Sequence, residues 1–266
     1  MKSAIILTGQ ARTFRYTFKT LDWCLFRKLP NPHFFVSVAD DEQAPDMDLL
    51  RQRYEHVEIE YVKQPEKIDE PEGNLDQHAG WFRSASVQSI LKQLWALEHG
   101  WDFFTAYNKA QWDKADPQGF RSSTAPLHSF DLIVRCRPDL WCQDIQMPEP
   151  LEISVKPNDC WTPWWGTFGG VNDRMAIMGP QAAPHYFRTF SNREALWKLG
   201  CPLHPETMVR ASLELGGVNV IDRLQAEFRI CRLPDAQHPK GPWLVTERQD
   251  GNQGPWPHEF AKMALS

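Results

Sequence analysis

The sequence predicts an α/β protein in which helices flank a mainly parallel central sheet. Two observations favour this fold class. Short apolar runs alternate with amphipathic segments along the first half of the chain, a pattern typical of parallel sheets covered on both faces. Two of these runs, 4–7 and 132–134, are followed closely by glycine or by charged residues. Buried strands that stop in this way commonly present ligand-binding groups at their carboxyl ends.

The composition is that of an ordinary globular protein. The chain has 266 residues, of which 42% are hydrophobic and 24% charged, which suffices for a sizeable core. A formal charge of −5 gives no general attraction to nucleic acid or anionic membranes. No apolar stretch approaches the ~20 residues that span a bilayer, and the N-terminus lacks a signal-peptide core. We therefore expect a soluble, cytoplasmic protein without a membrane span.

The cysteines and histidines do not form recognisable metal motifs. The six cysteines include no CxxC pair, and the nine histidines show no HxH or HxxxH spacing. A disulfide framework is not expected in a chain of this size without a signal peptide. The cysteines are therefore predicted to be reduced thiols.

The elements of the first half begin with a strand at 4–7. Gly9 then forms a tight turn into a helix at 14–26, as in a βα unit. The strongest helix signal spans 80–99, where apolar residues recur at three- and four-residue steps and Gly100 is expected to cap the helix. The remaining elements of this half are strands at 33–38 and 57–62 and a helix at 46–54.

The second half alternates less regularly. The strand at 132–134 is followed by a proline-rich stretch, and residues 160–166 form a predicted loop that contains three tryptophans. The remaining expected elements are strands at 175–178, 218–221 and 228–233 and helices at 182–190 and 205–215. A tail rich in proline and tryptophan begins at Pro234.

The segment 131–139 is the most informative part of the chain. Its apolar run ends in Arg135, Arg137 and Asp139. Two guanidinium groups and one carboxylate at a strand end suit a phosphate-bearing ligand, with a cation at Asp139 as a further option.

The turn after the first strand predicts a second group of anion-binding residues. Gly9 permits close backbone approach to a ligand, free amides at the start of the helix favour anions, and Arg12 adds a bidentate phosphate donor. A plain βα turn with a surface arginine would show the same pattern.

Four segments together resemble a family of GT-A-type glycosyltransferases found in bacterial, phage and viral polysaccharide loci. They are 5–14 (IILTGQARTF), 131–140 (DLIVRCRPDL), 172–179 (NDRMAIMG) and 205–218, which begins Pro-Glu and ends Gly-Val. Their order and rough spacing agree with the family pattern over residues 4–221.

The resemblance implies a single GT-A-like, Rossmann-like catalytic domain over residues 1–233. It would have a donor half at 1–145 and an acceptor half at 146–233, and the tail at 234–266 would pack on or near the site.

The resemblance also implies a sugar donor activated by a nucleoside diphosphate, usually with Mn²⁺ or Mg²⁺. The metal of this fold commonly sits on an Asp-x-Asp motif, whereas this sequence reads Arg137-Pro138-Asp139 and keeps only the second carboxylate. Either Asp139 binds the cation together with diphosphate oxygens, or Arg135 and Arg137 neutralise the diphosphate without a metal.

Candidate roles follow for individual residues. Asp173 is the first candidate for the base that deprotonates an acceptor hydroxyl, and Glu206 is the second. Asp173 could equally cap a turn, and Arg135 could form a structural ion pair. Glu206 could simply stabilise the first turn of a helix, where the helix dipole favours an acidic residue. The donor-binding candidates are Thr8, Gly9, Gln10, Arg12, Thr13, Arg135, Arg137 and Asp139, and Asp139 is also the metal-ligand candidate. The acceptor-binding candidates are Trp161, Trp164, Trp165 and Asn172. The three tryptophans are chosen because indole faces stack on sugars.

Three functions remain open from the sequence. The leading hypothesis is a glycosyltransferase that moves a sugar from a nucleoside-diphosphate sugar to a glycan, a lipid-linked sugar or another hydroxyl. The second is a phage-type transferase acting on modified DNA bases, the only role expected for nucleic acid. The third is a non-catalytic glycan-binding or scaffold protein, which the incomplete acidic motif would fit.

Overall fold

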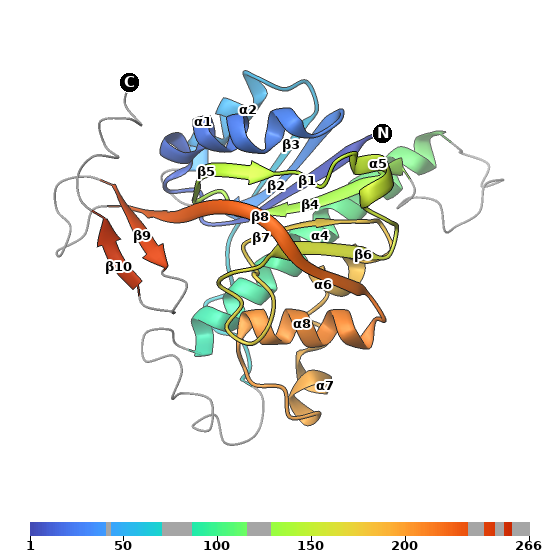
Figure 1. The fold of residues 1–266 in the computed structure, drawn as a ribbon, viewed down its shortest axis with the longest axis vertical. Helices are drawn as coiled ribbons and strands as arrows, with labels where there is room; N and C mark the ends of the chain where they lie inside the picture. The colour runs from blue at the N-terminus through green and yellow to red at the C-terminus, as the bar shows by residue number, and fades with distance from the viewer. Residues whose placement is uncertain (41–43, 71–86, 116–128, 234–241, 248–252, 257–266) are drawn as a thin grey trace.

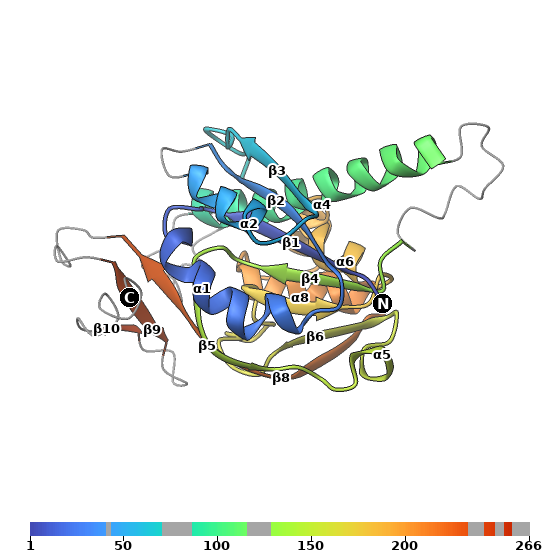
Figure 2. The same ribbon diagram turned by 90° about the horizontal axis from the view of Figure 1, so that it is seen from above.

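The computed structural model describes residues 1–40, 44–70, 87–115, 129–233, 242–247 and 253–256. Within these ranges the strands form a ten-stranded sheet in the order β10-β9-β8-β6-β7-β4-β1-β2-β3, and β5 pairs with β8 beside this path (Figure 1). Helices lie on both faces of the sheet (Figure 2).

The first half of the chain builds the parallel part of the sheet. The strands β1 (Ser3–Gly9), β2 (Pro32–Ala39), β3 (Val57–Val62) and β4 (Leu132–Cys136) all run in one direction. The strands predicted at 4–7, 33–38, 57–62 and 132–134 are confirmed. β4 is buried throughout, as expected for a parallel strand covered on both faces.

The sheet as a whole is mixed, so the prediction of a mainly parallel sheet is wrong. Next to β4 lies β7 (Met175–Met178), which is antiparallel to it and to β6 (Asp159–Pro163). β8 (Asn219–Arg232) is parallel to β6 but antiparallel to β5 (Leu140–Gln146) and to β9 (Trp243–Glu247). β10 (Gln253–Trp256) is antiparallel to β9.

The length of one turn explains part of this change of direction. Only residues 137–139 separate β4 from β5, whereas a crossover between parallel strands needs a dozen or more residues. The chain therefore reverses after β4, and the alternation of strands and helices holds only up to that point.

Four strands of the second half, β5, β6, β9 and β10, were not predicted. In β5 the register shifts between Cys142 and Asp144, and this irregularity hides the alternation of inward and outward residues. The first residues of the predicted tryptophan loop belong to β6. The two short strands predicted at 218–221 and 228–233 are parts of one long strand, β8.

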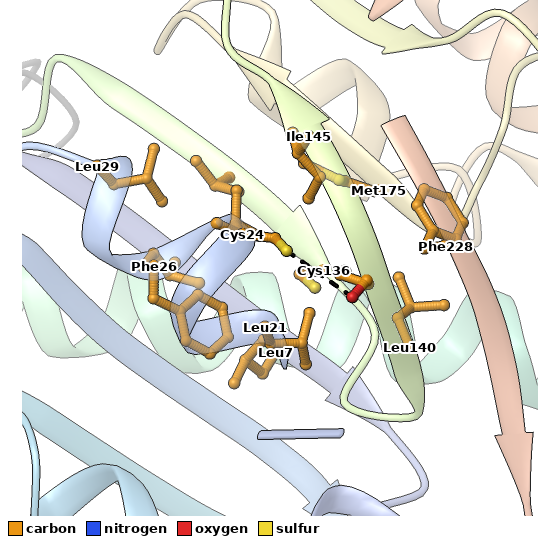
Figure 3. Packing of buried hydrophobic residues seen from close by; sticks show 14 of the residues in the cluster. Leu7, Leu21, Cys24, Phe26, Leu29, Cys136, Leu140, Ile145, Met175 and Phe228 are labelled. Carbon is orange, nitrogen blue, oxygen red and sulfur yellow. Dashed lines mark hydrogen bonds between the residues drawn. The ribbon is translucent and has the colours of Figure 1, made fainter. Parts of the chain in front are cut away.

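The core has two layers, one on each face of the parallel strands. Alternation along β4 places Leu132, Val134 and Cys136 in one layer and Ile133 in the other. The first layer is covered by α1 (Phe14–Cys24), β5 and β8, and Figure 3 shows Cys24 and Phe228 in it. The second layer is covered by α4 (Val87–Ala115), α6 (Ala183–Phe187) and α8 (Pro205–Leu215).

The predicted helices at 14–26, 46–54, 182–190 and 205–215 are confirmed as α1, α2 (Asp48–Arg51), α6 and α8, with different ends. Further short elements are η1 (Phe26–Lys28), η2 (Ala44–Met47), α5 (Leu151–Ser154) and α7 (Arg193–Lys198). All six cysteines lie in described ranges, where they are free thiols. No helix in the described ranges is both long and apolar enough to cross a membrane.

Gly100 does not cap a helix, contrary to the prediction, but lies inside α4, which continues to Ala115. A Cβ atom at Gly100 would come within 2.2 Å of the Thr8 Cγ2 atom on β1. The glycine therefore lets α4 approach β1, the strand that leads into the candidate ligand-binding turn at Gly9. The predicted helix residues 80–86 lie outside the described residues.

We expect Gly100→Ala to destabilise the protein by about 1–3 kcal/mol, because the new methyl group overpacks the contact with Thr8. In an ordinary helix interior the same substitution stabilises by about 0.5–1 kcal/mol, so the sign of the change is diagnostic. Urea denaturation measures the effect. The double variant Gly100→Ala with Thr8→Ser, which lacks the Cγ2 methyl, should recover stability. An unchanged or more stable Gly100→Ala single variant would contradict this account.

Candidate functional site

The turn between β4 and β5 holds a buried ion cluster. Arg137 Nε and Nη2 donate to Asp139 Oδ1 and Oδ2 at 2.8 and 2.7 Å, and Arg232 Nη1 lies 3.4 Å from Asp139 Oδ2. Burial by itself would raise the pKa of Asp139, which is 3% exposed. The guanidinium groups of Arg137, Arg232 and Arg135 outweigh burial, and the pKa lies below its usual range. Asp139 is therefore an ionised carboxylate held by arginines.

The turn between β1 and α1 lies against the same cluster. Thr13 Oγ1 donates to the carbonyl of Cys231 at 3.3 Å, and the Cys231 amide donates to the carbonyl of Asp139 at 2.8 Å. Thr17 Oγ1 donates to the carbonyl of Pro138 at 2.6 Å. Gly9 has a φ of +121°, a conformation that favours glycine. The two predicted donor-binding segments thus meet at one place, together with the end of β8.

Arginines are the dominant side chains at this place. We call the group of Arg12, Arg135, Arg137, Arg174 and Arg232 around Asp139 the arginine site. Burial lowers the pKa of Arg232, Asp139 opposes that shift, and Arg137, Arg12 and Arg174 lower the pKa further. Burial also lowers the pKa of Arg135, and its Nε has no hydrogen-bond partner among the described residues. Positive charge therefore exceeds the charge of Asp139.

The two candidate catalytic carboxylates are buried beside the arginine site. Asp173 Oδ2 accepts a hydrogen bond from the Gln93 side chain of α4, and Asp173 also interacts electrostatically with Arg135. Glu206, at the start of α8, lies 3.9 Å from Arg174 and 3.3 Å from His204 Nε2. The structure thus brings Asp173 and Glu206 into one cluster that adjoins the arginines.

A glycine fixes how these carboxylates are placed. A Cβ atom at Gly170 would lie 2.0 Å from the backbone oxygen of Glu206, and the Val171 amide donates to that oxygen at 3.1 Å. The loop that carries Asp173 is therefore seated directly on the first turn of α8. The sequence signal for this contact is the glycine pair before Asn172.

The predicted acceptor-binding residues separate into different environments. Asn172 is fully buried, its Nδ2 donates to the carbonyl of Trp165 at 2.9 Å, and its Oδ1 accepts from the Arg174 amide at 3.1 Å. Trp161 packs against the core from β6. Trp164 is 50% exposed, so among the three indoles it offers the largest free face.

Several residues of this cluster were missed by the sequence reasoning. Arg232 ends a strand just as Arg137 follows one, and that signal could have identified it. Gln93 lies in the middle of the long helix α4, and His204 precedes α8, so only the packing of these elements reveals their place. Burial lowers the pKa of His204, Asp173 opposes this shift and Arg174 adds to it, and the resulting pKa is about 4. His204 is therefore neutral at pH 7.

The described residues do not fit Mn²⁺ or Mg²⁺ at Asp139. Both oxygens of that carboxylate accept hydrogen bonds from Arg137, and Arg232 lies beside them. A divalent cation there would be repelled by these guanidinium groups. Among the described residues, no group of three or more His, Cys, Asp and Glu side chains could hold a metal ion.

We expect Asp139→Asn to destabilise the protein at pH 7 by about 3–5 kcal/mol, because it removes one partner of a buried ion pair. The folded-state pKa of Asp139 lies below its unfolded value of about 3.9, so the stabilisation is present above that pH. It is lost as the pH falls through the folded-state pKa. The difference in free energy of unfolding between wild type and variant should therefore stay constant from pH 7 to 5 and shrink below pH 4.

Urea denaturation over this pH range tests the prediction. Asp113→Asn serves as the control, because its carboxylate is exposed and pairs with Lys109 across one helix turn. A difference between wild type and Asp139→Asn that persists undiminished below the folded-state pKa would refute the assignment.

No family model and no curated protein matches the chain. The solved structures to which the fold is similar include the galactosyltransferase LgtC in complex with donor and acceptor sugar analogues, and an active-site mutant of LgtC. Each has 10% sequence identity and a TM-score of 0.41. The matches cover 82% of this chain and 72% and 71% of the two LgtC chains. These similarities are too distant to assign a family.

Proposed function

We propose that the protein is a glycosyltransferase that moves a sugar from a nucleoside-diphosphate sugar to a hydroxyl acceptor. The observation that carries the proposal is the arginine site at the carboxyl ends of β1, β4 and β8. Ligands of α/β proteins bind beyond the carboxyl ends of their parallel strands. Guanidinium groups in excess over one carboxylate suit the negative charge of a diphosphate.

The four motif segments support the transfer chemistry. Arg12, Arg137 and Asp139 come from the first two segments, and Asp173 and Glu206 come from the last two. Residues that are scattered over the sequence thus converge on one cluster that holds both cationic groups and carboxylates. In this proposal 1–145 is the donor half, and 146–233 contributes the carboxylates and Arg232.

The arginines would stabilise the departing diphosphate as negative charge develops on it. Arg12 is exposed, and Arg137 and Arg232 are partly exposed, so these three can contact a ligand directly. Each charge-assisted hydrogen bond is worth roughly 1.5–3 kcal/mol. Arg135 and Arg174 are buried and would act through their fixed positive charge.

The two carboxylates take different roles in this proposal. Asp173 is the proposed base for the acceptor hydroxyl, because its carboxylate lies beside the arginine site and interacts with Arg135. Glu206 lies between Arg174 and His204, so we assign it as a positioning residue that orients Arg174.

We expect Arg232→Ala to weaken the binding of UDP or GDP at least tenfold, because it removes a partly exposed guanidinium from the arginine site. Isothermal titration against UDP, GDP, CMP and their sugar conjugates measures the effect. Arg51→Ala is the matched control, because Arg51 pairs with Asp48 on the surface at α2. If wild-type protein binds none of these compounds, the proposal fails. Binding without transfer or hydrolysis of any donor would instead favour a non-catalytic protein.

We expect nucleotide binding and donor turnover to persist in excess EDTA, because guanidinium groups occupy both oxygens of Asp139 at the proposed diphosphate position. Parallel assays with added Mn²⁺ or Mg²⁺ complete the test. Loss of activity in EDTA and its recovery with Mn²⁺ would show that a cation, rather than the arginines alone, neutralises the diphosphate.

A further inference from the structure

The strands β5 and β8 carry a pocket of about 790 Å³, a volume within the range of known ligand sites. Its lining includes Trp141, Trp164 and Trp165 beside polar and charged residues of β5 and β8. None of the five residues of the arginine site lines it. Whatever binds here therefore meets a different chemistry from the proposed nucleotide ligand.

The pocket presents flat aromatic surfaces that are held in place. Trp165 donates to the carbonyl of Ala226 at 2.6 Å, and its ring centroid lies 4.8 Å from that of Phe228. Trp164 beside it is half exposed, and Trp141 is partly buried on β5. An indole face of this kind packs on the apolar C–H face of a sugar ring while its edge remains polar.

The polar residues of the pocket offer donors and acceptors side by side. The pairing of β5 with β8 sets Trp141 opposite Arg229 and Gln146 opposite Gln225. A sugar hydroxyl both donates and accepts, so it matches a surface of amide, carboxylate and guanidinium groups.

One pair in this face places two carboxylates side by side. Asp144 lies directly opposite Glu227, and like charges in that relation destabilise a sheet. Lys28 lies 3.6 Å from Asp144, and Arg229 interacts electrostatically with Glu227. The two carboxylates offer acceptors for the hydroxyl groups of a bound ligand.

The charged residues that line the pocket favour a neutral ligand over a polyanion. The lining residues include three carboxylates and two guanidinium groups, and Asp222 already accepts hydrogen bonds from Thr162 and Arg210. The pocket therefore has no excess of positive charge for nucleic acid or another polyanion, which needs such an excess.

The pocket continues past Trp164. A second pocket of about 540 Å³ shares Trp164 and Asp222 with the first and extends to Gly169, Thr207 and Glu214 on the loop and α8. Trp164 thus stands at the junction of two adjoining pockets, which suits an extended ligand better than a single ring. We call the two together the Trp164 groove.

We propose that the Trp164 groove binds a neutral oligosaccharide, with Trp164 stacked on one sugar ring and Glu227 accepting a hydrogen bond from a hydroxyl. The groove would hold a glycan acceptor if the protein is a sugar transferase. It does not require that reaction, because it shares no residue with the arginine site.

Saturation-transfer NMR and isothermal titration with maltohexaose, cellohexaose, laminarihexaose and chitotetraose test the proposal. At least one should bind, Trp164→Ala should weaken it at least tenfold, and Glu227→Gln should weaken it severalfold. Trp23→Ala is the matched control, because Trp23 is 69% exposed on α1 and does not line either pocket. UDP should bind Trp164→Ala and wild type equally.

The outcomes separate the two proposals. Oligosaccharide binding without nucleotide binding would support the proposed ligand of the Trp164 groove and contradict the proposed transferase function. Nucleotide binding without binding of any neutral oligosaccharide at millimolar concentration overturns the groove. Equal losses in Trp164→Ala and Trp23→Ala, or a preference for heparin over every neutral sugar, overturn it as well.

Discussion

The buried contact of Asp139 with Arg137 and Arg232 is the constraint on which the rest of the site depends. Three elements meet there, because Asp139 and Arg137 belong to the turn between β4 and β5, and Arg232 ends β8. The carboxylate cannot be buried without cationic partners, and the arginines cannot be gathered without a carboxylate. Asp139 therefore makes the arginine cluster feasible. The proposed binding of an anion depends on the surplus of guanidinium groups in that cluster.

The sequence was sufficient for the parts of the fold governed by local pattern. Continuous apolar runs identified β1 and β4, and three- and four-residue periodicity identified α4. It failed where tertiary contact overrides pattern. Local rules predict that Gly100 ends a helix, yet it lies inside α4, where its missing Cβ leaves room for the Thr8 methyl. The register shift in β5 hid a strand in the same way.

The same distinction between local pattern and tertiary contact applies to the residues of the candidate site. Arg137 and Asp139 were predicted because they follow a buried strand directly, and such a position can be recognised from the sequence alone. Arg232 was missed because its neighbours are distant in sequence. Asn172 was assigned to acceptor binding for its chemistry, but it uses both side-chain groups to hold its own loop. Residue type alone does not distinguish a group that binds a ligand from one that supports a turn.

The two proposed binding surfaces are joined by one strand. β8 contributes Arg223 to Arg229 to the Trp164 groove and then Arg232 to the arginine site. In the two proposals, the middle of β8 would meet a neutral ligand among balanced charges, and its last residue would meet an anionic ligand among surplus guanidinium groups. The chain as a whole carries a charge of −5, so the arginine site is a positive region within a negative protein. Such a field draws small anions to the site and repels long polyanions from the surrounding surface. This division favours a nucleotide over nucleic acid as the ligand of the arginines.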